Sequence, residues 1–283
     1  MELTAAEIRR AVRAALAEDL GSGDATTLAT VPPGAKSVAL MRAREPLTVA
    51  GIQFAEIAFR EMSAKLQIKK LLCDGARAKA GDTLLKISGS SRAILSAERV
   101  ALNFVQRLSG VATATAQFTD LVQGTRARIL DTRKTTPGWR RFEKYAVACG
   151  GGTNHRIGLF DMVLIKDNHL VALRNEKPNA IAAAVARACK KFPKLKVEVE
   201  ADTLEQVAQA ADAGADIILL DNMPPAILRQ AVKIVRGRAK TEASGGVNLK
   251  TVRAIAATGV DFISVGAITH SARAVDIGLD FEA

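Results

Sequence analysis

The chain has 283 residues, of which 48% are hydrophobic and 24% are charged, and its formal net charge is +11. This length suits one large domain or two unequal ones, and no apolar run reaches the roughly 18 residues that a membrane-spanning helix needs. Aromatic residues make up only 4% and the basic residues form no continuous tract, which argues against nucleic-acid binding. The charge therefore favours phosphorylated or carboxylated small molecules as partners, rather than nucleic acid or a membrane surface.

Cysteine usage and the start of the chain bear on its compartment. Cys73, Cys149 and Cys189 have neither disulfide nor metal-site spacing, which is typical of a reducing environment. Residues 1–20 alternate charged and apolar side chains, unlike a signal peptide. We therefore expect a cytoplasmic protein.

The first part of the chain indicates an α+β arrangement. Thr4 and Glu7 form a capping box before a helix expected to end near Glu18. A second helix is expected from about Ser96 to Arg107, where Ser109-Gly110 would end it. Between them lie four strand-like runs, 37–42, 46–50, 66–72 and 83–88. Strands and helices without regular alternation are typical of α+β domains.

After about residue 113 the pattern becomes regular. Apolar strand-like runs alternate with alanine-rich helical stretches, which predicts a parallel sheet. The runs end in polar residues near Asp131, Lys166, Glu200, Asp221, Ser244 and Gly266. Functional residues at the C-terminal strand ends favour a barrel over an open sheet. A Rossmann sheet is disfavoured because no G-x-G-x-x-G follows the first strand.

The segment from Asp131 to His169 concentrates cations among residues that favour loops. Its basic residues stand beside Gly, Pro, Thr and Asn and do not alternate with acids at helical spacing. They are Arg133, Lys134, Arg140, Arg141, Lys144, Arg156 and Lys166. Cations on loops between short apolar strands can hold a small polyanion, so this segment predicts an anion-binding active site.

Two glycine-containing segments end the last two predicted strands. They are Ser244-Gly245-Gly246 and Val265-Gly266-Ala267. Barrel loops at these positions commonly bind phosphate, because glycine lets backbone N–H groups approach the oxygens closely. The alternative is a pair of tight turns between strand and helix.

Glu200 and Asp221 end consecutive predicted strands. Carboxylates that face one barrel mouth repel each other unless a cation lies between them, and Mg²⁺ is commonly held by one or two carboxylates with substrate phosphate oxygens. The alternative is that both acids form ion pairs with neighbouring Lys or Arg residues.

Lys166 admits two interpretations. It is either a Schiff-base nucleophile or a cation that binds a substrate acid, and nearby guanidinium groups favour the second because Arg binds carboxylates bidentately. His155, between Asn154 and Arg156, is expected to donate to an anion. Trp139 is expected to be a packing residue or a lid over a flat ring.

Several blocks of the sequence resemble the quinolinate phosphoribosyltransferase family of NAD biosynthesis. They are EDLGSGDATT, SAERVALNFVQRLSGVATATA, DTRKTTPGWR, GGGTNHRIGLFDMVLIKDNH, EVE, LLDN, EASGGVN and ISVGAITHSA. The blocks span nearly the whole chain in the family's order.

The resemblance implies a fold and a reaction. The fold would be an α/β-sandwich N-terminal domain (1–112) and a reduced (β/α) barrel with mostly parallel strands (113–270), with residues 271–283 packing back near the first domain. The reaction would join quinolinate to phosphoribosyl pyrophosphate, giving nicotinate mononucleotide, CO₂ and pyrophosphate, with Mg²⁺ as cofactor. The enzyme would be a pentosyltransferase.

The resemblance also implies roles for individual residues. The carboxylates of quinolinate would be surrounded by Arg133, Lys134, His155, Arg156 and Lys166, with Thr132 beside them. The 5′-phosphate would be bound by Ser244, Gly245, Gly246 and Gly266, flanked by Val265 and Ala267. Glu200 and Asp221 would hold ribose hydroxyls or Mg²⁺, and with Lys166 they are the expected catalytic residues. Arg107 would reach the neighbouring subunit's site, which implies a homodimer or a higher oligomer.

Three alternatives remain open from the sequence. One is a barrel aldolase or decarboxylase with Lys166 as the Schiff-base residue. Another is a molybdenum-linked relative, which would share the fold but lose parts of the motifs. The third is a non-enzymatic module that binds phosphorylated metabolites or nucleic acid.

Overall fold

The computed structural model describes residues 2–282, which form two compact units. The first unit comprises residues 2–116, 137–151 and 271–282, and the second comprises 117–136 and 152–270. Within the described range, no helix combines the length and the apolar composition that crossing a membrane requires.

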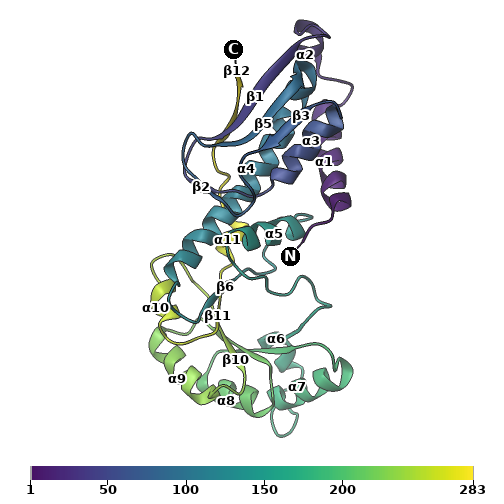
Figure 1. Cartoon of the computed structure of the whole chain (residues 1–283). Helices are drawn as coiled ribbons and strands as arrows, with labels where there is room; N and C mark the ends of the chain where they lie inside the picture. The colour runs from purple at the N-terminus through teal and green to yellow at the C-terminus, as the bar shows by residue number, and fades with distance from the viewer. Residues whose placement is uncertain (1, 283) are drawn as a thin grey trace. The chain divides into compact units, whose positions relative to one another are not determined.

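The first unit contains a four-stranded antiparallel sheet in the order β12-β1-β5-β3 (Figure 1). Its strands are β1 (Lys36–Ala43), β3 (Gln67–Lys70), β5 (Thr83–Ser90) and β12 (Ile277–Glu282), and a separate pair joins β2 (Leu47–Thr48) to β4 (Arg77–Ala78). β12 pairs antiparallel with β1, so a strand from the C-terminal end of the chain forms an edge of this sheet.

The helices of the first unit begin where local chemistry favours them. They are α1 (Ala5–Leu20), α2 (Ala25–Thr30), α3 (Ile52–Met62), most of α4 (Ser91–Leu121) and α5 (Arg140–Cys149). α1 starts at the predicted capping box of Thr4 and Glu7. Its buried residues Ile8, Val12 and Leu16 recur every four positions and give the helix one apolar face.

The helix α4 is longer than its predicted range of Ser96 to Arg107. Gly110 continues the helix and serves close packing, because a Cβ at this position would lie 2.0 Å from the carbonyl oxygen of Arg273. The buried Ser109 hydroxyl accepts the N–H of Ala50 at 2.9 Å and donates to the carbonyl of Ala50 at 3.1 Å. Ser109 and Gly110, which suggested a helix end, therefore lie within the helix and pack against the backbone of Ala50 and Arg273.

The segment 137–151, which contains α5, packs within the first unit. Trp139 stacks on Phe104 with ring centroids 5.1 Å apart, and the Tyr145 hydroxyl donates to Asp74 at 2.6 Å. The packing role predicted for Trp139 is thus observed, with Phe142 at its edge.

Three cations of the predicted anion-binding segment lie on α5, in the first unit. Arg141 forms an ion pair with Glu7 at 2.5 Å, Lys144 is fully buried, and Arg140 lies in the same helix. None of the three is among the residues that line the cavity of the second unit described below, so their predicted part in the anion-binding cluster is not observed.

The second unit is a six-stranded parallel sheet in the order β7-β8-β9-β10-β11-β6. Its strands are β6 (Arg128–Leu130), β7 (Val163–Ile165), β8 (Val197–Ala201), β9 (Ile217–Asp221), β10 (Lys240–Ser244) and β11 (Phe262–Ser264). The first and last of these strands along the chain are neighbours, and Thr153 bridges to Leu130. This strand order is that of an incomplete barrel, interrupted between Thr153 and β7.

Helices connect the parallel strands. They are α6 (Asp167–Val171), α7 (Ala180–Lys191), α8 (Leu204–Asp212), α9 (Pro225–Val235), α10 (Val252–Ala256) and α11 (Ala267–His270). Figure 1 shows α7, α8, α9 and α10 along the outside of the strands. The predicted mixed α/β class, with a parallel sheet and a separate antiparallel sheet, is confirmed. Parallel alternation brings all C-terminal strand ends to one side, where the predicted site residues lie.

Candidate active site

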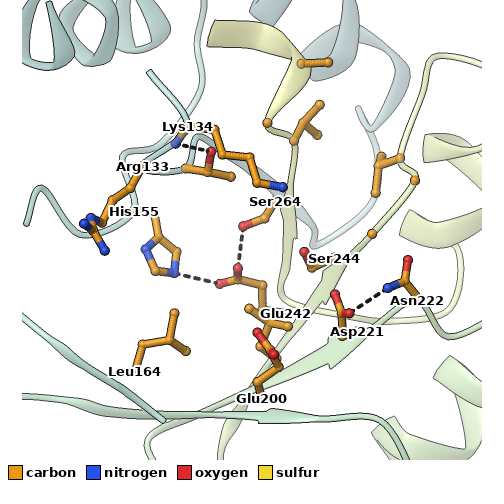
Figure 2. Close-up of a pocket in the computed structure, with 18 of the residues that line it drawn as sticks. Arg133, Lys134, His155, Leu164, Glu200, Asp221, Asn222, Glu242, Ser244 and Ser264 are labelled. Atoms are coloured by element: carbon orange, nitrogen blue, oxygen red, sulfur yellow. Dashed lines mark hydrogen bonds and ion pairs between the residues drawn. The ribbon is translucent and has the colours of Figure 1, made fainter. Parts of the chain in front are cut away.

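A cavity of about 750 Å³ opens at the C-terminal strand ends of the second unit (Figure 2). This volume is within the roughly 300–1,000 Å³ that is usual for small-molecule sites. It is lined by the predicted residues Thr132, Arg133, Lys134, His155, Arg156, Lys166, Glu200, Asp221, Ser244, Gly245, Gly246, Val265, Gly266 and Ala267. The structure thus brings together every predicted site residue except Arg107.

One part of the cavity carries guanidinium and ammonium groups. The loop after β6 holds Arg133 and Lys134, and the Lys134 carbonyl accepts a 2.7 Å hydrogen bond from the Thr269 hydroxyl. Arg156 donates to the carbonyl of Met162 at 3.1 Å. Burial lowers the pKa of Arg156, and the nearby Arg133 lowers it further. Two guanidinium groups that destabilise each other in this way are suited to an anionic ligand that offsets both charges.

The predicted acids follow the next strands around the barrel. The Lys166 ammonium, directly after β7, forms an ion pair with the Glu200 carboxylate of β8. Asp221 ends β9 and accepts a 2.6 Å hydrogen bond from the Asn222 side chain. Asn222 itself has a positive φ of 52°. Both carboxylates therefore line the cavity while a neighbouring side chain binds one of their oxygens, Lys166 for Glu200 and Asn222 for Asp221.

The glycine loop after β10 is shaped by close contacts. Gly245 and Gly246 have φ values of 93° and 60°, a backbone region that favours glycine. A Cβ on Gly245 would lie 2.1 Å from the Asn222 side-chain oxygen, whereas a Cβ on Gly246 would meet nothing within 4 Å. After β11, a Cβ on Gly266 would lie 3.1 Å from the His270 ring. Backbone N–H groups in such turns can surround an anion.

The comparisons with known proteins agree with this geometry. The family model for the quinolinate phosphoribosyl transferase N-terminal domain matches residues 24–109, and the model for the C-terminal domain matches residues 111–280. The chain belongs to the quinolinate phosphoribosyl transferase family. The predicted family resemblance is therefore confirmed.

Individual relatives match over nearly their whole length. The nicotinate-nucleotide pyrophosphorylase [carboxylating] of Mycobacterium leprae is 45% identical over 96% of both chains. The solved nicotinate-nucleotide pyrophosphorylase of Francisella tularensis has a TM-score of 0.93 and 41% identity, covering 99% of this chain and 98% of that one. NadC from Streptococcus pyogenes has a TM-score of 0.94 and 38% identity, with full coverage of both chains. Both units of this quinolinate phosphoribosyl transferase family member thus have solved counterparts.

Two buried glutamates near the cavity were not predicted from the sequence. Glu198 of β8 and Glu242 of β10 are fully buried, and the Ser264 hydroxyl donates to Glu242. Burial raises the pKa of Glu242 and the neighbouring Glu198 carboxylate raises it further, so Glu242 holds its proton more strongly than a solvated glutamate. Glu198 and Glu242 lie two residues before Glu200 and Ser244, so an acid within each apolar strand was the available signal.

Other cavity residues of this family member were also not assigned from the sequence. Besides Glu242 and Ser264, they are Leu164, Leu219, Asn222, Val247 and His270. Leu164, Leu219 and Val247 provide apolar surface against which a flat ring can pack.

Arg107 lies outside the cavity. It is a residue of α4 in the first unit, where it donates to Glu143 at 2.6 Å and to the carbonyl of Ala272. Its predicted contribution to a neighbouring subunit's site remains a prediction.

Proposed function

We propose that the chain transfers the phosphoribosyl group of phosphoribosyl pyrophosphate to quinolinate with loss of CO₂, producing nicotinate mononucleotide and pyrophosphate in NAD biosynthesis. The observation that carries this proposal is a single cavity with clustered cations on one side and glycine loops on the other, in a member of this family. The cations suit a dicarboxylate, and the glycine loops suit a sugar phosphate.

The reaction needs two substrates held close to each other. The pyridine nitrogen forms a bond to ribose C1 while the bond from C1 to pyrophosphate breaks. The bond to one carboxylate then breaks, CO₂ leaves, and the electron pair left on the ring carbon takes up a proton. Positive charge develops on the ribose in the first step, and negative charge develops on the leaving pyrophosphate.

Different side chains of the cavity act on the two substrates. Arg133, Arg156 and Lys134 bind the quinolinate carboxylates, while Glu200 and Asp221 face the ribose and stabilise its developing positive charge. Interactions that strengthen as charge separates raise the rate, whereas equal binding of the ground state does not. Lys166, paired with Glu200, orients that acid and contributes a cation to the anionic substrates.

Mg²⁺ is the cofactor that we propose. The donor set fits, because Glu200 and Asp221 offer carboxylate oxygens beside the glycine loops. One or two carboxylates together with phosphate oxygens are the usual ligands of Mg²⁺ in proteins. When bound, the ion would neutralise charge on the pyrophosphate.

The proposed enzyme is a cytoplasmic homodimer. Cys73, Cys149 and Cys189 are free, in keeping with a reducing compartment. Arg107 would complete the neighbouring subunit's site, after exchanging its present partners Glu143 and Ala272.

The proposed function is tested with quinolinate that carries an isotope in the carboxyl group that is lost. Labelled CO₂ and nicotinate mononucleotide should appear together, and only when phosphoribosyl pyrophosphate is present. The absence of nucleotide at saturating levels of both substrates would exclude the proposal.

The Schiff-base alternative is disfavoured by the structure. The side-chain nitrogen of Lys166 is engaged in an ion pair with Glu200, whereas a Schiff-base lysine needs a free amine to attack a carbonyl. Borohydride should therefore trap no substrate on Lys166.

A further inference from the structure

His155 makes two hydrogen bonds to protein groups, and a third atom of the residue lies close to two carboxylates. Its backbone N–H donates to the buried Asp131 at 2.8 Å. Its Nδ1 accepts the backbone N–H of Arg156 at 2.8 Å. Its Nε2 lies 3.0 Å from a carboxylate oxygen of Glu198 and 3.6 Å from one of Glu242, and Figure 2 shows the ring directed at Glu242.

These contacts determine where the ring proton lies. A nitrogen that accepts an N–H must have its lone pair directed at that donor, so Nδ1 of His155 carries no proton. The proton is therefore on Nε2, which faces two carboxylates. The side chain is only 8% exposed, so neither nitrogen is directed into open solvent.

We propose that His155 is a positioning residue for Arg156 and does not itself donate a hydrogen bond to the substrate carboxylate. This inference rests on the proposed function and changes the role expected for His155 within it. Both ring nitrogens face protein groups. To donate a hydrogen bond to the substrate, Nε2 would have to turn away from the carboxylates of Glu198 and Glu242.

The hydrogen bond to the His155 ring restrains Arg156. Its backbone N–H is fixed by the His155 ring, and its guanidinium is fixed by the carbonyl of Met162 at 3.1 Å. Both ends of the residue are thereby restrained while the guanidinium lines the cavity beside Arg133. A preorganised guanidinium binds a carboxylate with less loss of conformational entropy than a mobile one.

The same cluster could be considered as a metal site, because ligand atoms of His155, Glu198 and Glu242 lie within 4.8 Å of one another. A metal on Nε2 of a neutral ring requires the proton on Nδ1. That proton would then face the N–H of Arg156, which is a repulsive arrangement. The observed contact therefore favours the positioning role.

Nitrogen NMR of the histidine rings tests the proton assignment directly. The chain has only 3 histidines, so ¹⁵N-labelled histidine gives a spectrum that can be assigned with the His155→Gln variant. We expect the Nε2–H form of His155, unchanged when quinolinate is added. The Nδ1–H form, a doubly protonated ring in the complex, or a change of this signal on adding Zn²⁺ or Mg²⁺ alone would overturn the proposal.

Binding measurements test the coupling to Arg156. Glutamine at position 155 keeps a donor near the position of Nε2 but removes the acceptor for the Arg156 N–H. By calorimetry, His155→Gln should weaken quinolinate binding about tenfold, as loss of one positioning hydrogen bond would. In the Arg156→Lys background the same substitution should have almost no further effect.

The matched control is Arg187→Lys, an exposed arginine of α7 that pairs with Glu176. In that background, His155→Gln should again weaken binding about tenfold. Equal effects in the Arg156→Lys and Arg187→Lys backgrounds would show direct recognition by His155 and refute the positioning role. If the wild type binds no quinolinate, the proposed function fails, and the NMR spectrum still decides the assignment of the ring proton.

Discussion

The glycine loop after β10 allows a sharp comparison between neighbouring positions. Gly245→Ala and Gly246→Ala place the same methyl group on residues with positive φ values, 93° and 60°. In this backbone region each alanine costs about 1–2 kcal/mol of conformational strain. If phosphoribosyl pyrophosphate binds only when the loop has its present conformation, this cost raises the KM for that substrate about tenfold.

Gly245→Ala carries an additional cost that Gly246→Ala does not. The new methyl group would lie 2.1 Å from the Asn222 oxygen, so this side chain must retreat by about 1 Å from its position beside Asp221. We expect the KM for phosphoribosyl pyrophosphate to rise about a hundredfold in Gly245→Ala and about tenfold in Gly246→Ala, with little change for quinolinate.

Initial rates at varied concentrations of each substrate measure this difference. Adding Asn222→Ala to Gly245→Ala should recover part of the loss, relative to Asn222→Ala alone. Equal KM values in the two alanine variants, or a change confined to quinolinate, would refute the assignment of this loop to the phosphate.

Further predictions concern the cations, the buried acid, the metal and the oligomer. Arg133→Ala and Arg156→Ala should each raise the KM for quinolinate about tenfold to a hundredfold, since a charge-assisted hydrogen bond contributes about 1.5–3 kcal/mol, and circular dichroism should show an intact fold. The raised pKa of Glu242 means that the folded state holds this proton more tightly than the unfolded chain, so its contribution to stability is full at acidic pH and is lost as the pH rises through the raised value. Thermal unfolding should show Tm falling from about pH 4.5 to about pH 8 and levelling off above that, and Glu242→Gln should make Tm less dependent on pH over that interval. Chelation of divalent ions should abolish nucleotide formation and Mg²⁺ should restore it, whereas retained activity in excess chelator would exclude the proposed cofactor. At quinolinate concentrations well below the raised KM, mixing Arg107→Ala and Arg133→Ala subunits should restore about a quarter of the wild-type sites, and no recovery in exchanging dimers would argue against a shared site.

The parallel strands and the residues at their ends could be predicted because their signal is local. Each apolar run terminates within a few residues of a polar side chain, and parallel pairing necessarily gathers those ends on one side. Glu200, Asp221 and Ser244 could therefore be assigned to one site without knowledge of any contact.

The buried acids could not be placed from local signals. Whether Glu198 and Glu242 meet His155 depends on how β8 and β10, which are not adjacent in the sheet, approach across the barrel interior. The path of residues 137–151 was missed for a related reason. Their cations resemble those of the site, but Trp139 and Tyr145 have their partners on distant segments of the first unit.

The pairing of β12 with β1 also bears on how the chain folds during synthesis. The strand that completes one edge of the first sheet comes from residues 277–282, so β1 keeps an unpaired edge until these residues have been synthesised and have emerged from the ribosome. N-terminal domains usually fold first during translation, but here the first unit is completed by residues that follow all of the second unit. A nascent chain stalled just before Ile277 would therefore present an open strand edge, which is a common site of aggregation.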